Sequence, residues 1–230
     1  MRTVAFITQK GGAGKTTLAA SVAVAAADAG ERVIAFDLDL QASLLRWGER
    51  RKDTRARSKV MVEPLEAERL PLIGAIVEGI ADAGFTLAIF DTAGNDQHTA
   101  ALVSETADLS LLPARPTSLD VEVTAATFRS LFLAKRSAAF VLNQCPATPR
   151  HARADQAASG LERLGILAPT LASRLDFQDA MAAGLGVTEY ACDGKSAQEV
   201  EALWAWIRDR LAQSGGETGV SAEQTLTEPV

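Results

Sequence analysis

The sequence predicts an α/β fold in which a mostly parallel sheet is covered by helices on both faces. Three observations support this prediction: short segments are continuously apolar, helical segments lie between them, and polar residues follow the apolar segments. A strand buried on both faces reads as a continuous apolar run, and strands that alternate with helices are usually parallel. In such sheets ligands bind beyond the carboxyl ends of the strands. We therefore expect the functional residues at that edge.

The predicted elements follow one another from the first residues of the chain. Strand 2–8 is followed by a glycine cluster and by a helix of strong helix formers that stops at Gly30. The other predicted strands are 32–39, 85–95, 109–114 and 138–144. Further helices are predicted at about 65–83, 118–134, 150–164 and 195–212. No linker interrupts this series, so we expect residues 1–212 to form one domain.

The composition limits the classes of function. The chain has 230 residues, of which 47% are hydrophobic, and a formal net charge of −6. It is therefore no polycation that would attract nucleic acid over its whole surface. Residues 213–230 contain three acids, no bases and few apolar residues, so we expect a disordered acidic tail. The other residues then carry a net charge of −3.

The few cysteines and histidines argue against zinc and nucleophile chemistry. Cys145 and Cys192 lie far apart in no metal-ligand pattern, and neither His98 nor His151 lies near a suitable nucleophile. Free thiols are typical of a reducing cytoplasm. The first apolar run is interrupted by polar and glycine residues, and no run of about 18 apolar residues follows. We expect a soluble, cytoplasmic protein.

The strongest functional signal is the segment TQKGGAGKTT at 8–17. It differs from the usual phosphate-binding loop because Gln9 replaces the first glycine and because a second lysine, Lys10, is present. Glycines let the backbone N–H groups approach a phosphate closely, and the following helix N-terminus adds partial positive charge. In such a loop Lys15 reaches the β- and γ-phosphates and the Thr16 hydroxyl ligates Mg²⁺. The predicted nucleotide-binding residues are Gly11, Gly12, Ala13, Gly14, Lys15, Thr16 and Thr17.

The stretch KGGAGKTT resembles the deviant Walker A box, KGGxGKTT, of the ParA/MinD family of ATPases. The resemblance covers most of residues 1–212 and implies a P-loop fold with ATP and Mg²⁺ as cofactors. It also implies an ATP-dependent homodimer in which Lys10 crosses to the phosphates bound by the other subunit. The catalytic residues that it implies are Lys10, Lys15 and Asp39.

Two further segments resemble the acidic motifs of this family. The segment FDLDLQ (36–41) is similar to the family's hhhDxDPQ box, with Leu40 in place of the proline. By resemblance, Asp39 positions the attacking water and Asp37 supports the metal through a bound water. The segment LAIFDTAGN (87–95) is similar to a Walker B strand, in which Asp91 would hold Mg²⁺ through water.

Two more features are implied by the same resemblance. A switch that senses the γ-phosphate would consist of Thr92, Ala93 and Gly94. The segment FVLNQ (140–144) places Asn143 where family members read the adenine edge. A strand-end asparagine is also a common turn former.

The member of the family that the chain resembles most is a small ParA-type protein without an N-terminal helix-turn-helix. The acidic tail differs from the basic amphipathic helix by which MinD-type proteins bind membrane, so we expect no membrane partner. Nitrogenase-reductase relatives hold an iron–sulfur cluster with paired cysteines, whose spacing is absent here. A redox ATPase of that type and a MinD-like positioning ATPase are the alternatives.

The resemblance implies slow ATP hydrolysis that a ParB-like or other small adaptor stimulates. ATP-bound dimers of such proteins bind DNA non-specifically and segregate or position a cargo, which gives a nucleoid-associated location. The sequence does not name the cargo, which could be a plasmid, a chromosome or a protein complex. By the same resemblance the expected DNA contact is Arg174, with Arg150 and Arg153 as secondary candidates. Segment 46–59 has seven basic residues and two acids, and it is interpreted first as a solvated helix end and loop.

Overall fold

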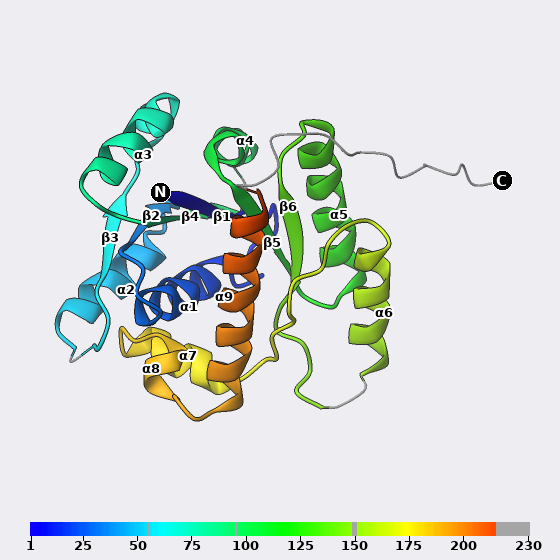
Figure 1. Ribbon diagram of the computed structural model, residues 1–230. Helices are drawn as coiled ribbons and strands as arrows, with labels where there is room; N and C mark the ends of the chain where they lie inside the picture. The colour runs from blue at the N-terminus through cyan, green and yellow to red at the C-terminus, as the bar shows by residue number, and fades with distance from the viewer. Residues whose placement is uncertain (55, 95, 149–150, 215–230) are drawn as a thin grey trace.

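The computed structural model describes residues 1–54, 56–94, 96–148 and 151–214 (Figure 1). In these residues six strands form one sheet in the order β3-β2-β4-β1-β5-β6, and every neighbouring pair is parallel. The predicted parallel α/β fold is confirmed. The strands are β1 (Arg2–Phe6), β2 (Val33–Leu38), β3 (Val60–Pro64), β4 (Leu87–Thr92), β5 (Leu109–Ala114) and β6 (Ala138–Leu142).

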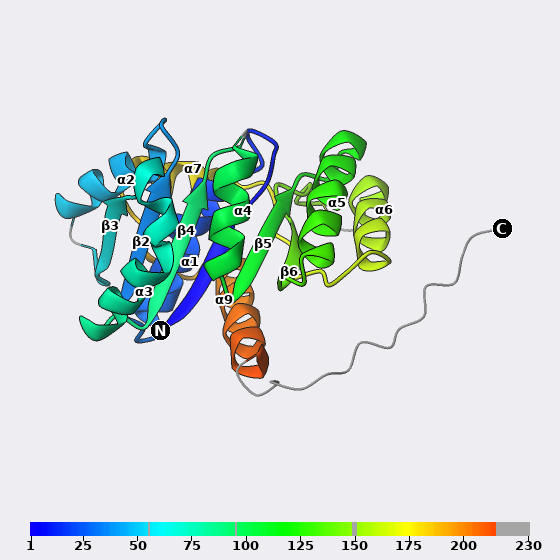
Figure 2. The ribbon, with the colours of Figure 1, turned by 90° about the horizontal axis from the view of Figure 1, so that it is seen from above.

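Helices cover both faces of the sheet (Figures 1 and 2). One face packs against α1 (Lys15–Asp28), α2 (Ser43–Lys52), α7 (Leu175–Ala182), α8 (Val187–Tyr190) and α9 (Lys195–Ser214). The other face packs against the 3₁₀ helix η1 (Ala67–Leu72), α3 (Ile73–Asp82), α4 (Gln97–Thr106), α5 (Ser118–Leu133) and α6 (Ala152–Glu162). Figure 2 shows α3 and α4 in front of the sheet and α1 behind it. No helix in the described part of the chain is both long and apolar enough to cross a bilayer.

Helix α1 lies at the centre of the molecule and is built mainly from alanine and valine. It contacts β2, β4 and α9, and Ala19, Ala20 and Ala23 have no exposed surface. A helix that is surrounded on all sides needs no polar stripe, so its sequence shows no amphipathic pattern. The small side chains let α1 pack closely between the sheet and α9. This packing fixes the position of the loop from which α1 begins.

Several elements were not predicted from the sequence: β3, α2, α4, α7 and α8. Strand β3 has only five residues, ends at Pro64 and lies at the edge of the sheet, so it lacks the continuous apolar run of a central strand. Helix α2 is basic and buries only a narrow stripe. The helix predicted at 65–83 is divided into η1 and α3. At the other end α9 continues to Ser214, and residues 215–230 of the predicted tail lie outside the described residues.

An irregular segment, residues 166–173, runs along the outer edge of β6. Its backbone exchanges hydrogen bonds with Phe140, which donates to Ile166 at 2.8 Å and accepts from Ala168 at 2.8 Å. Farther along, Ser173 N–H donates to the Cys145 carbonyl at 2.7 Å. The segment therefore covers this edge of the sheet and carries the chain to the start of α7.

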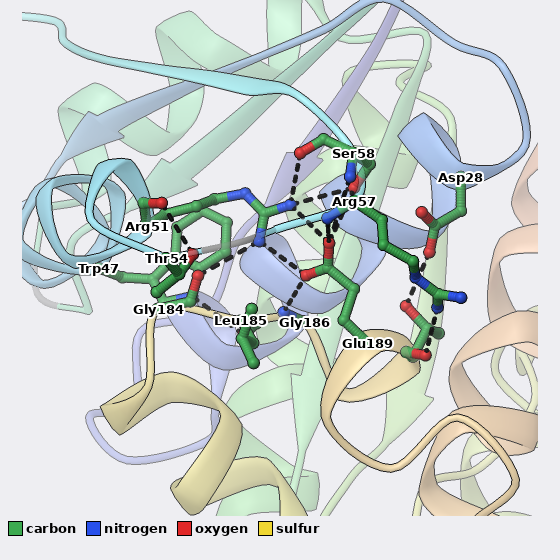
Figure 3. A network of polar contacts seen from close by, with 11 residues as sticks. Asp28, Trp47, Arg51, Thr54, Arg57, Ser58, Gly184, Leu185, Gly186 and Glu189 are labelled. Atoms are coloured by element: carbon green, nitrogen blue, oxygen red, sulfur yellow. Dashed lines mark hydrogen bonds and ion pairs between the residues drawn. The ribbon is translucent and has the colours of Figure 1, made fainter.

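A buried ion pair joins α2 to α8 (Figure 3). Arg51 and Glu189 form two N–H···O contacts of 2.7 and 2.9 Å, and their side chains are 5% and 3% exposed. Arg51 also donates to the Ser58 carbonyl at 2.7 Å and lies over the Trp47 ring, with 5.3 Å from Cζ to the ring centroid. Trp47 Nε1 in turn donates to the Leu185 carbonyl at 3.1 Å. We call this group of residues the α2–α8 clamp.

The clamp uses much of the basic segment 46–59 for internal contacts. Besides Arg51, Arg57 donates to the Thr188 carbonyl at 3.1 Å and Arg50 donates to the Met181 carbonyl at 3.2 Å. The interpretation of this segment as a solvated helix end and loop is therefore wrong for Arg51, and the exposed Arg50 and Arg57 also have bonded partners. A local charge count does not show these partners, because they lie 131–138 positions away in the chain.

The clamp predicts a specific dependence of stability on pH. Hydrogen bonds from Arg51 and from backbone N–H groups outweigh burial and lower the pKa of Glu189 from 4.5 to about 2. Because this pKa is lowered in the folded state, the stabilisation is present above pH 4.5 and is lost as the pH falls towards 2. Glu189→Gln should therefore lower the free energy of unfolding by about 3 kcal/mol at neutral pH, and by less at pH 3. Urea unfolding of both proteins at pH 7, 4.5 and 3 measures this difference.

The matched control is Glu49, which pairs with Lys52 on the surface of α2 with both side chains about 70% exposed. Glu49→Gln should leave the unfolding midpoint unchanged, because exposed ion pairs contribute little. Equal effects of the two substitutions would contradict the role of the clamp.

Candidate nucleotide-binding site

The loop between β1 and α1 is shaped by two glycines in the left-handed region. Gly12 has φ of 79°, and Gly14, the N-cap of α1, has φ of 90°. A Cβ atom on Gly14 would lie 2.3 Å from Asn143 Nδ2, so no other residue fits without movement. Gly11 and Gly12 are exposed, whereas Ala13 is buried. The loop thus presents its backbone to solvent just before the N-terminus of a buried helix, as a phosphate site requires.

Two amide side chains at the end of β6 donate hydrogen bonds to carbonyl groups of this loop. Asn143 Nδ2 donates to the Ala13 carbonyl at 2.8 Å, and Gln144 Nε2 donates to the Gly12 carbonyl at 2.9 Å. The Asn143 backbone is itself fixed because its N–H donates to the Ala114 carbonyl at 2.8 Å. Gln144 was not among the residues predicted from the sequence, and the adenine contact predicted for Asn143 stays a prediction. Both residues act here as braces of the phosphate loop.

Lys15 starts α1 and is only 8% exposed. Burial lowers the pKa of its ammonium group, and the negative charges of Asp91 and Asp39 oppose that shift. An ammonium group in such a position gains from a ligand that brings further negative charge. Lys10 lies before the loop's first glycine and is half-buried. Within the described residues, its side chain has no hydrogen-bond or ion-pair partner.

The predicted switch after β4 lies against the phosphate loop. A Cβ atom on Gly94 would lie 3.3 Å from the Gly11 nitrogen and 3.3 Å from Lys15 Nζ. Thr92 is buried, and its hydroxyl donates to the Phe6 carbonyl at 2.8 Å. The end of β4 is therefore bonded to β1 through Thr92, and Gly94 lies close to the phosphate loop. A phosphate in the loop would be close to this glycine.

Two aspartates lie side by side at the carboxyl edge of the sheet. Asp37 of β2 and Asp91 of β4 are direct partners in the strand register. The Asp37 carboxylate accepts from Asp39 N–H at 3.0 Å and from Leu45 N–H at 2.9 Å, while burial raises its pKa. Asp91 is 1% exposed, and neither of its carboxylate oxygens meets the geometry of a hydrogen bond. Burial raises the pKa of Asp91 to about 7, although the Thr16 hydroxyl and Lys15 are near enough to oppose the shift.

These residues fit a bound Mg²⁺. A buried carboxylate without a partner is costly, and a cation relieves that cost. Asp91, Asp37 and the Thr16 hydroxyl offer the hard oxygen donors that Mg²⁺ prefers. The described residues contain no group of three or more His, Cys, Asp or Glu that could hold a metal ion alone. Mg²⁺ in proteins usually keeps several waters and is bound by one or two carboxylates together with substrate phosphates.

The turn after β2 carries Asp39 and the residue that replaces the family proline. Asp39 is half-buried, and its carboxylate accepts from Gln41 N–H at 2.9 Å. Its carbonyl accepts from Ala42 N–H at 2.7 Å, and Ala42 has φ of 49°. Hydrogen bonds of Asp39 thus close this turn without a proline. Leu40 is fully exposed, at 102%.

A hollow of about 140 Å³ lies beside the phosphate loop. Its walls come from the start of α1, the end of β6, segment 172–174 and α7. Arg174 lines it and forms an ion pair with Glu199, at 2.6 Å from Nη2 to Oε1, while Ala172 N–H donates to the same carboxylate at 3.0 Å. A larger hollow of about 530 Å³ between α2 and β3 contains none of the predicted site residues.

The other predicted DNA contacts are dispersed. Arg153 is exposed and lines a separate hollow between α5 and α6, and Arg150 lies outside the described residues. Arg174 and Arg153 thus line two different hollows. Of the two free cysteines, Cys145 is buried, which raises its pKa to about 11, and Cys192 is exposed.

The chain is similar to known proteins over most of its length. The family model described as VirC1 protein matches residues 1–201. Protein virC1 of Rhizobium radiobacter is 33% identical over 129 residues, which is 56% of this chain and 55% of that relative. The alignment thus spans about half the length of that relative. The maintenance of carboxysome distribution protein A of Gloeobacter kilaueensis is 31% identical over 212 residues, 91% of this chain and 94% of the relative.

Solved structures show the same fold at lower identity. The complex of a Cyanothece McdA variant with ATP has a TM-score of 0.73 at 15% identity, covering 96% of this chain and 98% of that one. The septum site-determining protein MinD of Pyrococcus horikoshii, complexed with Mg-ADP, has a TM-score of 0.71 at 18% identity, with 93% and 98% covered.

The two glycines Gly14 and Gly11 provide a test of the loop geometry. Gly14→Ala should destabilise the nucleotide-free protein by about 1–3 kcal/mol, because it forces a side chain into the left-handed region and onto Asn143. It should also weaken nucleotide binding strongly. In Gly11→Ala the added methyl group meets nothing within 4 Å and φ is ordinary, so the nucleotide-free stability should not change. Urea unfolding and nucleotide titration of both variants measure these effects. Equal loss of stability in Gly14→Ala and Gly11→Ala would contradict the loop geometry described for Gly14.

Proposed function

The chain belongs to the VirC1 protein family, and from this premise we propose that it is a ParA-type ATPase that segregates or positions a cargo. The relatives named above confirm the resemblance to the ParA/MinD ATPases. In the proposed cycle an ATP-bound dimer binds DNA non-specifically, and a ParB-like or other small adaptor stimulates a slow hydrolysis that releases it. The protein would then be associated with the nucleoid.

One observation supports this proposal most strongly. The braced loop of Gly11–Thr16, the buried ammonium of Lys15 and the unpartnered carboxylate of Asp91 meet at one edge of the sheet. A nucleoside triphosphate with Mg²⁺ would satisfy all three: its phosphates would accept from the backbone N–H groups of the loop and pair with the Lys15 ammonium, and the metal would balance the Asp91 carboxylate. Lys10, which has no partner of its own within the described residues, adds a second cation at the same edge.

Each residue has a defined task in the proposed reaction. Lys15 and the N-terminus of α1 would hold the β- and γ-phosphates, while Thr16 would hold the metal directly and Asp37 and Asp91 would hold it through water. Bound Mg²⁺ would neutralise charge that develops on the phosphate oxygens. Asp39, which reaches the edge from the neighbouring strand β2, orients the attacking water. Phosphoryl transfer to water needs positioning and electrostatic stabilisation, and these groups supply both.

The proposed DNA binding depends on a second subunit, because a single chain offers only isolated basic side chains. The residues outside the tail carry a net charge of −3, which gives one chain little long-range attraction for a duplex. Arg174 is neutralised by Glu199 and therefore contacts a phosphate only if it leaves or shares that carboxylate. Arg153 is exposed. Pairing of two chains would double such local basic sites along one duplex.

The proposed function predicts different roles for Lys15 and Lys10. Lys15→Ala should abolish nucleotide binding, because the phosphates lose their buried cation. Lys10→Ala should bind ADP and a slowly hydrolysed ATP analogue as a monomer but should not dimerise. Sedimentation with each nucleotide shows the two states. A Lys10→Ala dimer as tight as that of the wild type would exclude a role of Lys10 across the subunits.

The proposed function also predicts how the protein binds DNA. Binding should require ATP, should not depend on sequence, and should weaken with salt with a log–log slope of about −4 to −5 if roughly four to six phosphates are contacted. Arg174→Ala and Arg153→Ala should each weaken binding to all sequences alike and flatten the slope, because phosphate contacts carry no base information. The assay is gel-shift binding to random duplexes with ADP and with the ATP analogue at rising salt.

The matched control for these arginines is Arg69→Ala, which changes an exposed arginine on η1. It should leave DNA binding unchanged. Equal binding in ADP, or binding to one sequence only, would rule out the carrier cycle. No binding at low salt would show an ATPase that works on a surface other than DNA.

A further inference from the structure

Four apolar side chains are exposed where α5 ends and where the chain leaves α6, those of Phe132, Leu133, Leu164 and Ile166. The first two residues are 66% and 81% exposed, and the last two are 39% and 38% exposed. Phe128 of α5 joins the two pairs, because its ring stacks with that of Phe132 at 6.3 Å between centroids, while a Cβ atom on Gly165 would lie 2.3 Å from its Cζ. We call these four residues the α5–α6 patch.

The patch is surrounded by basic side chains. Residues 129–136 and 162–166 contain four bases and one acid, Glu162. One of the bases, Arg136, pairs with Glu105 at 3.8 Å. The other three are exposed, and their side chains have no hydrogen-bond or ion-pair partner in the part of the chain that the structure describes: Arg129, Lys135 and Arg163. Exposed apolar side chains beside unpaired cations fit an occupant that is both apolar and acidic.

The end of the chain has this composition. Residues 215–230 contain three acids and no base, and the acids are Glu217, Glu223 and Glu228. Each of them lies two or three positions from an apolar residue, either Val220, Leu226 or Val230. A segment with so few apolar residues does not fold alone, but it can bind a surface that supplies the missing apolar and basic groups.

Helix α9 brings this segment to the same edge of the sheet as the patch. Leu211 and Ala212 of α9 line a hollow of about 210 Å³ together with Arg2 and Thr86, which lie at the amino ends of β1 and β4. Helix α5 ends just before β6 begins, so the patch also lies at the amino edge (Figure 2).

The segment is long enough to reach the patch. Strand β5 is the only strand between β1 and β6, so the starts of these two strands are about 10 Å apart. Residues 215–230 span about 50 Å when extended. This length also allows for the passage round the edge, from the face of the sheet that α9 covers to the face that α5 covers.

We propose that residues 215–230 bind the α5–α6 patch of their own chain. The glutamates pair with the three free cations, and the apolar residues between them cover Phe132 and Leu133. The covalent link keeps the segment at a high effective concentration near the patch, so weak contacts suffice. Because the patch lies at the edge opposite the phosphate loop, the nucleotide site stays open when the segment is bound. The bound segment shields an apolar surface from other molecules.

A second basic surface is less suited to the same segment. The hollow of about 530 Å³ between α2 and β3 is lined by Lys52 and Lys59, but also by Glu49 and Glu63. Lys52 is paired with Glu49 at 2.8 Å. The cations of this hollow are thus partly neutralised, whereas those of the patch are not. Its exposed Lys59 provides an internal control for Lys135.

The test is zero-length cross-linking of the dilute full-length chain. A carbodiimide joins a carboxylate to an amine that it contacts, with loss of water, and mass spectrometry of the digested monomer identifies the joined residues. Cross-links from the three glutamates to Lys135 should exceed those to Lys59 at least about fivefold, and they should disappear at about 0.5 M salt, which screens the charges. A small ester should acylate Lys135 at least about threefold more slowly in the full chain than in a chain that ends at Ser214.

Two double variants separate the patch from exposed apolar residues elsewhere. Phe132→Gln with Leu133→Gln should reduce the cross-links to Lys135 at least about fivefold, because the segment loses its apolar contacts. Met61→Gln with Leu72→Gln changes exposed apolar residues of β3 and η1 and should leave the cross-links unchanged. Both variants should bind ADP like the wild type, which shows that they are folded.

Three results would overturn the proposal. Cross-links mainly to Lys52 or Lys59 would assign the segment to the hollow between α2 and β3. Cross-links only in species of twice the mass would assign it to a second copy of the chain. If Lys135 forms no cross-link and is acylated equally fast with and without residues 215–230, the patch is not covered by them. Sedimentation with vesicles of anionic phospholipid would then show whether the patch contacts a lipid surface instead.

Discussion

The parallel register of β1, β4 and β2 is the constraint on which the site depends. It pairs Asp91 with Phe6 at the end of β1 and with Asp37 at the end of β2. Because side chains alternate between the faces of a strand, a shift by one residue would turn Asp91 away from its neighbours. The same register anchors the end of β4, where Thr92 bonds to the Phe6 carbonyl. The carboxylates of Asp37 and Asp91 and the glycine-rich loop are therefore placed together by backbone pairing.

Side chains from distant parts of the chain then hold the loops that leave this edge. Asn143 and Gln144 brace the phosphate loop from β6, and the α2–α8 clamp fixes the helix whose first turn bonds to Asp37. Replacing both partners of a buried ion pair by apolar residues is often neutral, whereas removing one partner leaves a buried charge uncompensated, so Arg51 and Glu189 depend on each other's positions. The position of α2 therefore matters for the site, because Leu45 N–H of this helix donates to the Asp37 carboxylate at 2.9 Å.

Features with a local sequence pattern could be predicted, whereas features that depend on contacts between distant segments could not. The central strands read as continuous apolar runs, and the glycine-rich loop follows directly from the chemistry of phosphate binding. Strand β3 was missed because an edge strand with Pro64 has no such run. The brace by Gln144 and the partners of Arg51 could not be predicted, because they depend on residues more than 130 positions away. The ion pair of Arg174 with Glu199 also appears only when α9 is packed.

Helix α1 begins differently from α4 and α5. Side chains of Asp96 and Thr117 accept hydrogen bonds at the starts of α4 and α5, whereas Gly14 offers none to α1. The first N–H groups of the most central helix are thus left to be completed by whatever occupies the loop. An anion there serves as the missing N-cap, and its effect reaches the apolar core through α1. Occupancy of the loop and the melting temperature of the whole molecule are consequently coupled, so that the folded chain itself reports its nucleotide state.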